Sequence, residues 1–208
     1  MLKIVLPPLI LCVLSISIAA QQPTEVLGSI ENGVYKNSFL RFELTYPSGW
    51  LVSETEERKA AIQIGSEAIK TGNKKADALL ADSAKKELVL FLISEKPLGS
   101  SDNGAFGMSV TKLPAKGYTP KMLTETFKST FLASTKNRLV KDISIHTIGG
   151  RSWGNVLIDL DIFGKAIHTN YFVTVIGEYA LVATMSYQDE KHLEKMEAAF
   201  RTIKFSKE

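Results

Sequence analysis

The sequence predicts an α+β domain in which an antiparallel sheet of about six to seven strands has helices packed on both faces. Three observations lead to this fold class. Three consecutive strand-like segments between residues 153 and 187 are separated by tight glycine turns, which predicts an antiparallel meander. The nearly continuous apolar run Leu88–Ile93 is typical of a strand buried on both faces. Segments with apolar residues at helical spacing lie between the strands, so we expect them to cover the sheet.

The first 20 residues are predicted to be a cleaved export signal. Lys3 precedes the apolar run Ile4–Ile18, and the run ends in the small residues Ala19 and Ala20. The run is shorter than the roughly 20 residues that a bilayer-spanning helix needs, so cleavage is favoured over a permanent anchor. We therefore expect an exported protein, periplasmic or secreted, with no membrane span after cleavage.

Composition excludes several classes of function. The single cysteine, Cys12, lies inside the expected signal, so the mature chain offers no disulfide, thiol nucleophile or thiolate metal site. The chain has 25 Lys and Arg against 22 Asp and Glu, a balance that predicts no nucleic-acid partner. The length remaining after the signal is suited to a single domain.

The mature chain opens with an expected flexible lead, residues 21–32, and the single domain is expected to cover residues 33–208. Strict alternation over 39–46 predicts a strand with one buried face. After the turn at 47–49, Ser53 and Glu56 have the spacing of a capping box, which predicts a helix from there to about Ile69. A second helix is expected to follow, with the apolar stripe Ala76, Leu79, Leu80 and Ala84.

Beyond Leu88–Ile93, the segment Pro97–Gly107 is rich in Gly and Ser and is expected to be a loop, with a strand over Met108–Lys112. Thr119 and Pro120 predict a helix N-cap and first turn, and this helix is expected to end near Asn137. A strand is expected over Val140–Ile148. After the meander, a helix starting at Asp189 and a short extended piece, Ile203–Phe205, complete the chain.

The register of the meander brings polar side chains together. If Gly164–Lys165 and Gly177–Glu178 are both two-residue turns, Asp161 lies across from His168, Asp159 across from Asn170, and His168 across from Tyr187. All five side chains then share one face of the sheet and form the candidate ligand-binding site: Asp159, Asp161, His168, Asn170 and Tyr187. An Asp–His pair can orient an imidazole, but it is also an ordinary device of a solvated sheet face, and a zinc site needs three or four ligands.

Other candidate residues are favoured as structural. The chain contains no nucleophile elbow, phosphate-binding P-loop, zincin helix or dinucleotide fingerprint. His146 and His192 stand alone in the sequence, and His192 is expected to be solvated on a charged helix face. Trp50 and Trp153 follow turns and are expected to pack in the core. No metal and no cofactor is expected.

Two segments resemble a known family. Residues 37–50, which read NSFLRFELTYPSGW, resemble the opening strand and Tyr-Pro-x-x-Trp turn of PsbP-like domains. Tyr171–Tyr187 followed by Asp189–Phe205 is similar to the last hairpin and closing helix of these domains. The superfamily also includes Ran-binding Mog-type proteins and exported bacterial proteins, the branch that this chain resembles most. The resemblance implies an α/β/α sandwich and a role in binding or assembly, but it carries over no functional residue.

Two hypotheses of function follow. The first is a noncatalytic exported binding or assembly domain, whose partner is an unknown envelope protein or small ligand held by one sheet face or by the Pro97–Gly107 loop. The alternative is a metal-dependent hydrolase that uses Asp159, Asp161 and His168. Convergence of these three side chains in one pocket would favour the second hypothesis.

Overall fold

The computed structural model describes residues 26–206, apart from residues 69, 71–73, 75–76, 79–80, 82–84 and 163. The expected export signal lies outside the described residues, as does most of the expected second helix with its stripe Ala76, Leu79, Leu80 and Ala84. None of the helices in the described part is long and apolar enough to cross a membrane.

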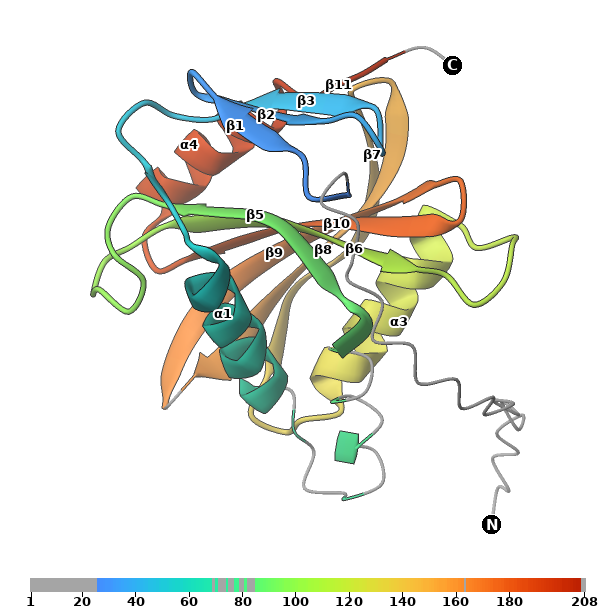
Figure 1. Cartoon of the computed structure of the whole chain (residues 1–208). Helices are drawn as coiled ribbons and strands as arrows, with labels where there is room; N and C mark the ends of the chain where they lie inside the picture. Colours follow the sequence, from blue (N-terminus) through green and yellow to red (C-terminus); the bar gives the residue numbers. More distant parts are fainter. Residues whose placement is uncertain are drawn as a thin grey trace.

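Two antiparallel sheets form the framework (Figure 1). The larger has seven strands, as the sequence predicts. In sheet order they are β4 (Leu51–Val52), β5 (Leu88–Ser94), β6 (Ala105–Lys112), β10 (Tyr179–Tyr187), β9 (Lys165–Ile176), β8 (Arg151–Ile162) and β7 (Arg138–Ile148). The smaller sheet was not expected. Its strands, in order, are β1 (Ser29–Glu31), β2 (Val34–Asn37), β3 (Phe42–Thr45) and β11 (Lys204–Phe205).

The small sheet joins the first and last described elements of the chain. β1 lies within the segment expected to be a flexible lead, residues 21–32, and it pairs with β2. The Tyr35 hydroxyl donates to the Leu27 carbonyl at 2.8 Å, and Asn37 Nδ2 donates to the Val26 carbonyl at 2.8 Å. Ordered structure therefore begins before Gly33, because buried polar side chains of β2 bond the backbone that precedes β1.

Three helices have described bounds: α1 (Thr55–Ala68), α3 (Pro120–Leu132) and α4 (Glu190–Phe200). The predicted N-caps of two of them are confirmed, since the Thr119 side chain accepts from the Met122 amide and Asp189 accepts from the Lys191 amide. α3 ends at Leu132, before the expected Asn137. Asn137 Nδ2 instead donates to the Phe131 carbonyl at 2.9 Å, which satisfies an acceptor at the helix end.

Apolar side chains form a separate cluster on each face of the large sheet. On one face, Leu123 and Phe131 of α3 pack with Val156, Ile158 and other alternate residues of the meander. On the opposite face, α4 and the small sheet pack over a second cluster that includes Trp50 and Trp153, both buried as expected. The expected α/β/α sandwich is thus matched only in part, because a sheet as well as a helix covers the face opposite α3.

The meander register is partly as predicted. In the second hairpin Ile176 pairs with Tyr179 and His168 pairs with Tyr187, as expected. In the first hairpin Ile162 pairs with Lys165, so Lys165 belongs to β9 and the predicted turn Gly164–Lys165 is wrong. Asp159 therefore lies across from His168, and the predicted pairs Asp161–His168 and Asp159–Asn170 are wrong. Gly164 has φ 78° and takes the second loop position, where a left-handed backbone favours glycine.

Candidate functional site

A row of four polar side chains crosses the large sheet from its edge inward. Arg138 of β7 pairs with Asp159 of β8, Asp159 pairs with His168 of β9, and His168 pairs with Tyr187 of β10. Arg138 Nη2 donates to Asp159 Oδ2, and His168 Nδ1 lies against Asp159 Oδ1, each at 2.5 Å. The shift of two residues in the first hairpin keeps the alternation of the strand, so these side chains still share a face.

Asp159 is the centre of this row. Its side chain is only 6% exposed, whereas that of Arg138 is 74% exposed and that of His168 is 34% exposed. Burial alone would raise the pKa of Asp159, but hydrogen bonds from Arg138 and His168 outweigh burial and hold the pKa below its usual value. The carboxylate is therefore charged at neutral pH, and both of its oxygens are occupied by partners within the protein.

Tyr187 closes the row on the inner side. Its ring lies 5.3 Å from the His168 ring, and its buried hydroxyl has no hydrogen-bond partner within the described part of the chain. Burial, and after it the nearby carboxylates with Glu190 first among them, raise the pKa of Tyr187 to about 12. Tyr187 thus contributes a neutral phenol that packs on the histidine.

The other two predicted site residues belong to different contacts. Asp161 Oδ1 accepts from the Gly164 amide at 3.0 Å, so this side chain stabilises the hairpin loop. Asn170 Oδ1 accepts from Asn155 Nδ2 at 2.5 Å, and the same amide group of Asn155 donates to the Tyr171 carbonyl. The structure therefore brings together Asp159, His168 and Tyr187, and it separates Asp161 and Asn170 from them.

The chemistry available to the row is limited. Asp159 fixes the orientation of His168 through Nδ1, which leaves Nε2 and the remaining donors of the exposed Arg138 guanidinium to meet a ligand. Among the described residues no group of three or more His, Cys, Asp or Glu is arranged to hold a metal ion. The arrangement offers a histidine hydrogen bond at a sheet surface, and nothing in it favours the hydrolase alternative.

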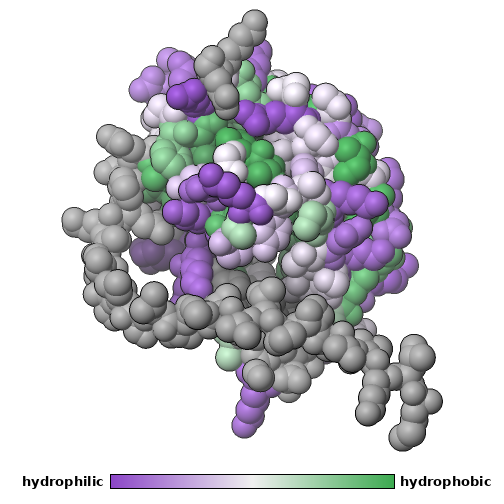
Figure 2. Space-filling model, turned by 90° about the vertical axis from the view of Figure 1, so that its right-hand side faces the viewer, coloured by the Kyte–Doolittle hydropathy of each residue, from purple (hydrophilic) through white to green (hydrophobic). Residues whose placement is uncertain are grey.

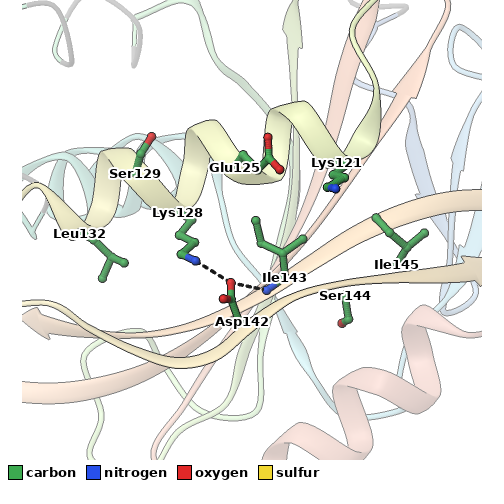
Figure 3. Close-up of a pocket in the computed structure, with 9 residues that line it drawn as sticks. All are labelled: Lys121, Glu125, Lys128, Ser129, Leu132, Asp142, Ile143, Ser144 and Ile145. Carbon is green, nitrogen blue, oxygen red and sulfur yellow. Dashed lines mark hydrogen bonds and ion pairs between the residues drawn. The ribbon is translucent and has the colours of Figure 1, made fainter. Parts of the chain in front are cut away.

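A second feature is an open groove between α3 and the edge strand β7, with a volume of about 630 Å³ (Figure 3). Figure 3 shows the side chains of Ile143 and Ile145 directed toward α3, while Ser144 points away from it. Lys128 of α3 bonds Asp142 of β7 at 2.6 Å across one end of the groove. The groove is lined by Lys121, Glu125, Lys128, Ser129, Leu132, Asp142, Ile143, Ser144 and Ile145.

Sequence reasoning missed this groove because it depends on the position of β7 in the sheet. β7 is the last strand in the order, so its outer side pairs with no other strand of the described chain. The available signal in the sequence was a pair of apolar residues, Val140 and Ile145, within a largely polar strand. The structure leaves their side chains 44% and 51% exposed, although Leu139 and Ile143 of the same strand pack against the cluster under α3. A strand with most of its side chains exposed is typical of a sheet edge.

Sequence reasoning also misplaced His192. Rather than being solvated, it is buried between α4 and the loop that joins β5 to β6. Nδ1 lies 2.6 Å from Glu95 Oε2 and Nε2 lies 2.9 Å from Asp102 Oδ1. Hydrogen bonds from Lys195 and then His192 lower the pKa of Glu95, and hydrogen bonds from His192 and then Lys191 lower the pKa of Asp102. The expected ligand-binding loop Pro97–Gly107 is therefore pinned to α4, and its last three residues, Ala105–Gly107, belong to β6.

The fold can be compared with known structures. No protein-family model matches the sequence, and none of the curated proteins is similar to it. The solution structure of cyanobacterial PsbP (CyanoP) from Synechocystis sp. PCC 6803 superposes with a TM-score of 0.52 at 12% sequence identity, covering 86% of this chain and 99% of that one. The fold is PsbP-like. At this identity the likeness concerns the fold alone.

A further solved structure is more distant. LpqN of Mycobacterium tuberculosis, described as involved in cell envelope biogenesis, has a TM-score of 0.45 at 13% identity, covering 80% of this chain and 83% of that one. This superposition is too coarse to support an argument about structure or function. The PsbP-like fold therefore rests on the superposition with CyanoP.

Proposed function

We propose that the chain is a noncatalytic, exported binding or assembly domain that holds a protein of the cell envelope in the groove between α3 and β7. The observation that carries the proposal is the combination of this groove with the outer edge of β7. An edge strand offers main-chain donors and acceptors, and the exposed Ile145 offers apolar surface beside them. Export is supported by the leader sequence at residues 1–20.

The polar row supports a noncatalytic role. Both oxygens of Asp159 are bonded to side chains of the protein, and Asp161 is bonded to a loop amide. A hydrolase of the kind considered would need these carboxylates to converge with His168 on a metal or a water. The row is better suited to stiffening β7 and β8 than to chemistry, because it ties the edge strand to the centre of the sheet.

Site-specific photocrosslinking tests the proposal. A photoreactive amino acid at Ile145, in the groove, is expected to trap one envelope protein in intact cells. The matched control is the same residue at Leu51, which is 45% exposed on β4 at the opposite end of the sheet order. Equal trapping at both positions, or none at Ile145, would contradict the proposal.

A further inference from the structure

The outer edge of β7 is regular over only part of its length. Ser144–Ile148 pairs residue for residue with Arg151–Asn155 of β8, while the pairing shifts between Leu139 and Lys141 and again between Lys141 and Ser144. Bulges of this kind disturb the hydrogen-bonding edge of a strand, so they discourage indiscriminate pairing there. The regular stretch keeps an edge to which an extended chain can add, and it borders the groove at Ser144 and Ile145.

The chain segment that forms this edge and the groove carries an excess of positive charge, although the groove lining itself holds two lysines and two carboxylates. Residues 119–148, which hold α3 and β7, contain five Lys and Arg and two Asp and Glu, an excess of three positive charges that equals the net charge of the whole chain. Asp142 is already bonded to Lys128, and Arg138 is bonded to Asp159. Lys121 lines the groove together with Glu125, and Lys141 is exposed on β7 at a position paired with Leu157, on the sheet face away from α3. Neither lysine makes an ion pair with any described residue, so both remain available to a partner strand at the edge.

Apolar surface accompanies the charge. Ile145 and Val140 of β7 are exposed, and Met122 of α3 is 48% exposed. On the side of the molecule seen in Figure 2, hydrophobic patches lie between hydrophilic ones, so the described surface there is mixed. A strand with alternating acidic and apolar side chains can meet both kinds of surface, since its successive side chains point in opposite directions.

We infer that the partner presents an extended acidic segment, with apolar residues between the acidic ones, which adds as a strand to Ser144–Ile148 of β7 beside α3. The inference rests on the proposed function and names the chemistry of its partner. Main-chain hydrogen bonds along the edge supply affinity, and Lys121 and Lys141 select acidic side chains. A second copy of this chain is disfavoured as the occupant, because it would bring one basic edge against another.

A model peptide tests the inference on the whole chain. The probe is a short peptide of alternating Glu and Val, and the matched peptide replaces Glu with Lys. Amide hydrogen exchange should slow in residues 144–148 when the Glu peptide is added and should not change with the Lys peptide. Protection at other strands, or equal protection by both peptides, would overturn the inference.

Charge reversal adds a second measurement. The double variant Lys121→Glu, Lys141→Glu should weaken binding of the Glu peptide about tenfold, since each rim charge has a modest effect. The matched control, Lys116→Glu with Lys165→Glu, reverses two exposed charges away from the groove and should bind as the unaltered chain does. Equal weakening in both double variants would contradict recognition at β7.

Two further outcomes separate this inference from competing occupants. Slower exchange at residues 144–148 that depends on protein concentration, with no peptide present, would identify a second copy as the occupant and overturn it. Slower exchange at residues 144–148 on addition of a short single-stranded oligonucleotide would also overturn the inference. If crosslinking at Ile145 traps a protein but the Glu peptide does not slow exchange in β7, the proposed function is supported. The inference that the partner adds an acidic strand to β7 is then wrong.

Discussion

Asp159 is a buried carboxylate whose two partners both reach solvent. Removing the Asp159 carboxylate takes the hydrogen-bond acceptor from Arg138 and His168. Water can take its place, because both side chains are partly exposed. We therefore expect Asp159→Ala to lower the free energy of unfolding by about 2 kcal/mol, less than the cost of breaking a fully buried ion pair. Urea denaturation at neutral pH measures this change.

Asp161→Ala is the matched control for this prediction, because the Asp161 side chain accepts one hydrogen bond, from the Gly164 amide of the hairpin loop. Asp161→Ala should lower the free energy of unfolding by less than about 1 kcal/mol.

The stability contributed by Asp159 should also depend on pH. Since the pKa of Asp159 is lowered in the folded state, its contribution is complete above the ordinary Asp pKa of about 3.9 and is lost as the pH falls through the lowered value. The difference between the unaltered chain and Asp159→Asn should therefore shrink below about pH 4.

Single residues also mark where sequence reasoning is limited. His192 lies between Lys191 and Leu193 on a helix face expected to be charged and was expected to be solvated, yet it is buried because Glu95 and Asp102 come from a segment 90 to 97 residues away. Periodicity along one helix cannot supply partners from a distant segment. The position of Trp153 directly after a turn and at the start of a strand, by contrast, predicted its place in the core correctly.

At the scale of elements, α3 lies unusually close to β8. A Cβ added at Gly154 would overlap Thr124 Oγ1 and would lie 2.8 Å from the Pro120 carbonyl oxygen. Both atoms belong to the first turns of the helix, where the Thr124 hydroxyl donates to that same carbonyl at 2.8 Å. Gly154 therefore sets the distance between the helix and the sheet.

We predict that Gly154→Ala destabilises the protein by about 2 kcal/mol, because the helix must shift to admit the methyl group. The matched control is Gly65→Ala in α1, where an added Cβ meets nothing within 4 Å. Alanine is the better helix former, so this control should raise stability by up to about 1 kcal/mol. Thermal unfolding of both variants measures the two effects. If Gly154→Ala left the stability unchanged, the close packing of α3 against Gly154 would not be needed for stability.

The elements differ in how far local sequence determines them. The caps at Thr119 and Asp189 were predictable because they depend on residues two or three apart in the chain. The register of the first hairpin was not, since Gly164 suits either loop position and each choice gives a good turn. A shift of two residues conserves the face of each side chain, which is why the predicted site still contains a true contact, Asp159 with His168, despite the wrong pairing.

Across the whole molecule, the two ends of the described chain meet in the small sheet. Phe205 of β11 pairs with Phe42 of β3, and its ring also lies 6.4 Å from that of Trp153. The guanidinium of Arg151, at the start of β8, stands 4.7 Å over the Phe205 ring. The sequence predicted Ile203–Phe205 as an extended piece but not its partner, because that pairing joins positions about 160 residues apart.

This closure predicts one cooperative unit. Trp50 and Trp153 lie in the same apolar cluster, although one precedes β4 at the edge of the large sheet and the other is fully buried on β8. In Trp50→Phe and in Trp153→Phe, the fluorescence of the remaining tryptophan should change at the same guanidinium concentration as the far-ultraviolet circular dichroism. Phe205→Ala should move the transitions of both probes downward together. If one tryptophan reported a different guanidinium midpoint from the circular dichroism, the chain would contain two folding units. The small sheet would then not couple the ends of the chain to the core.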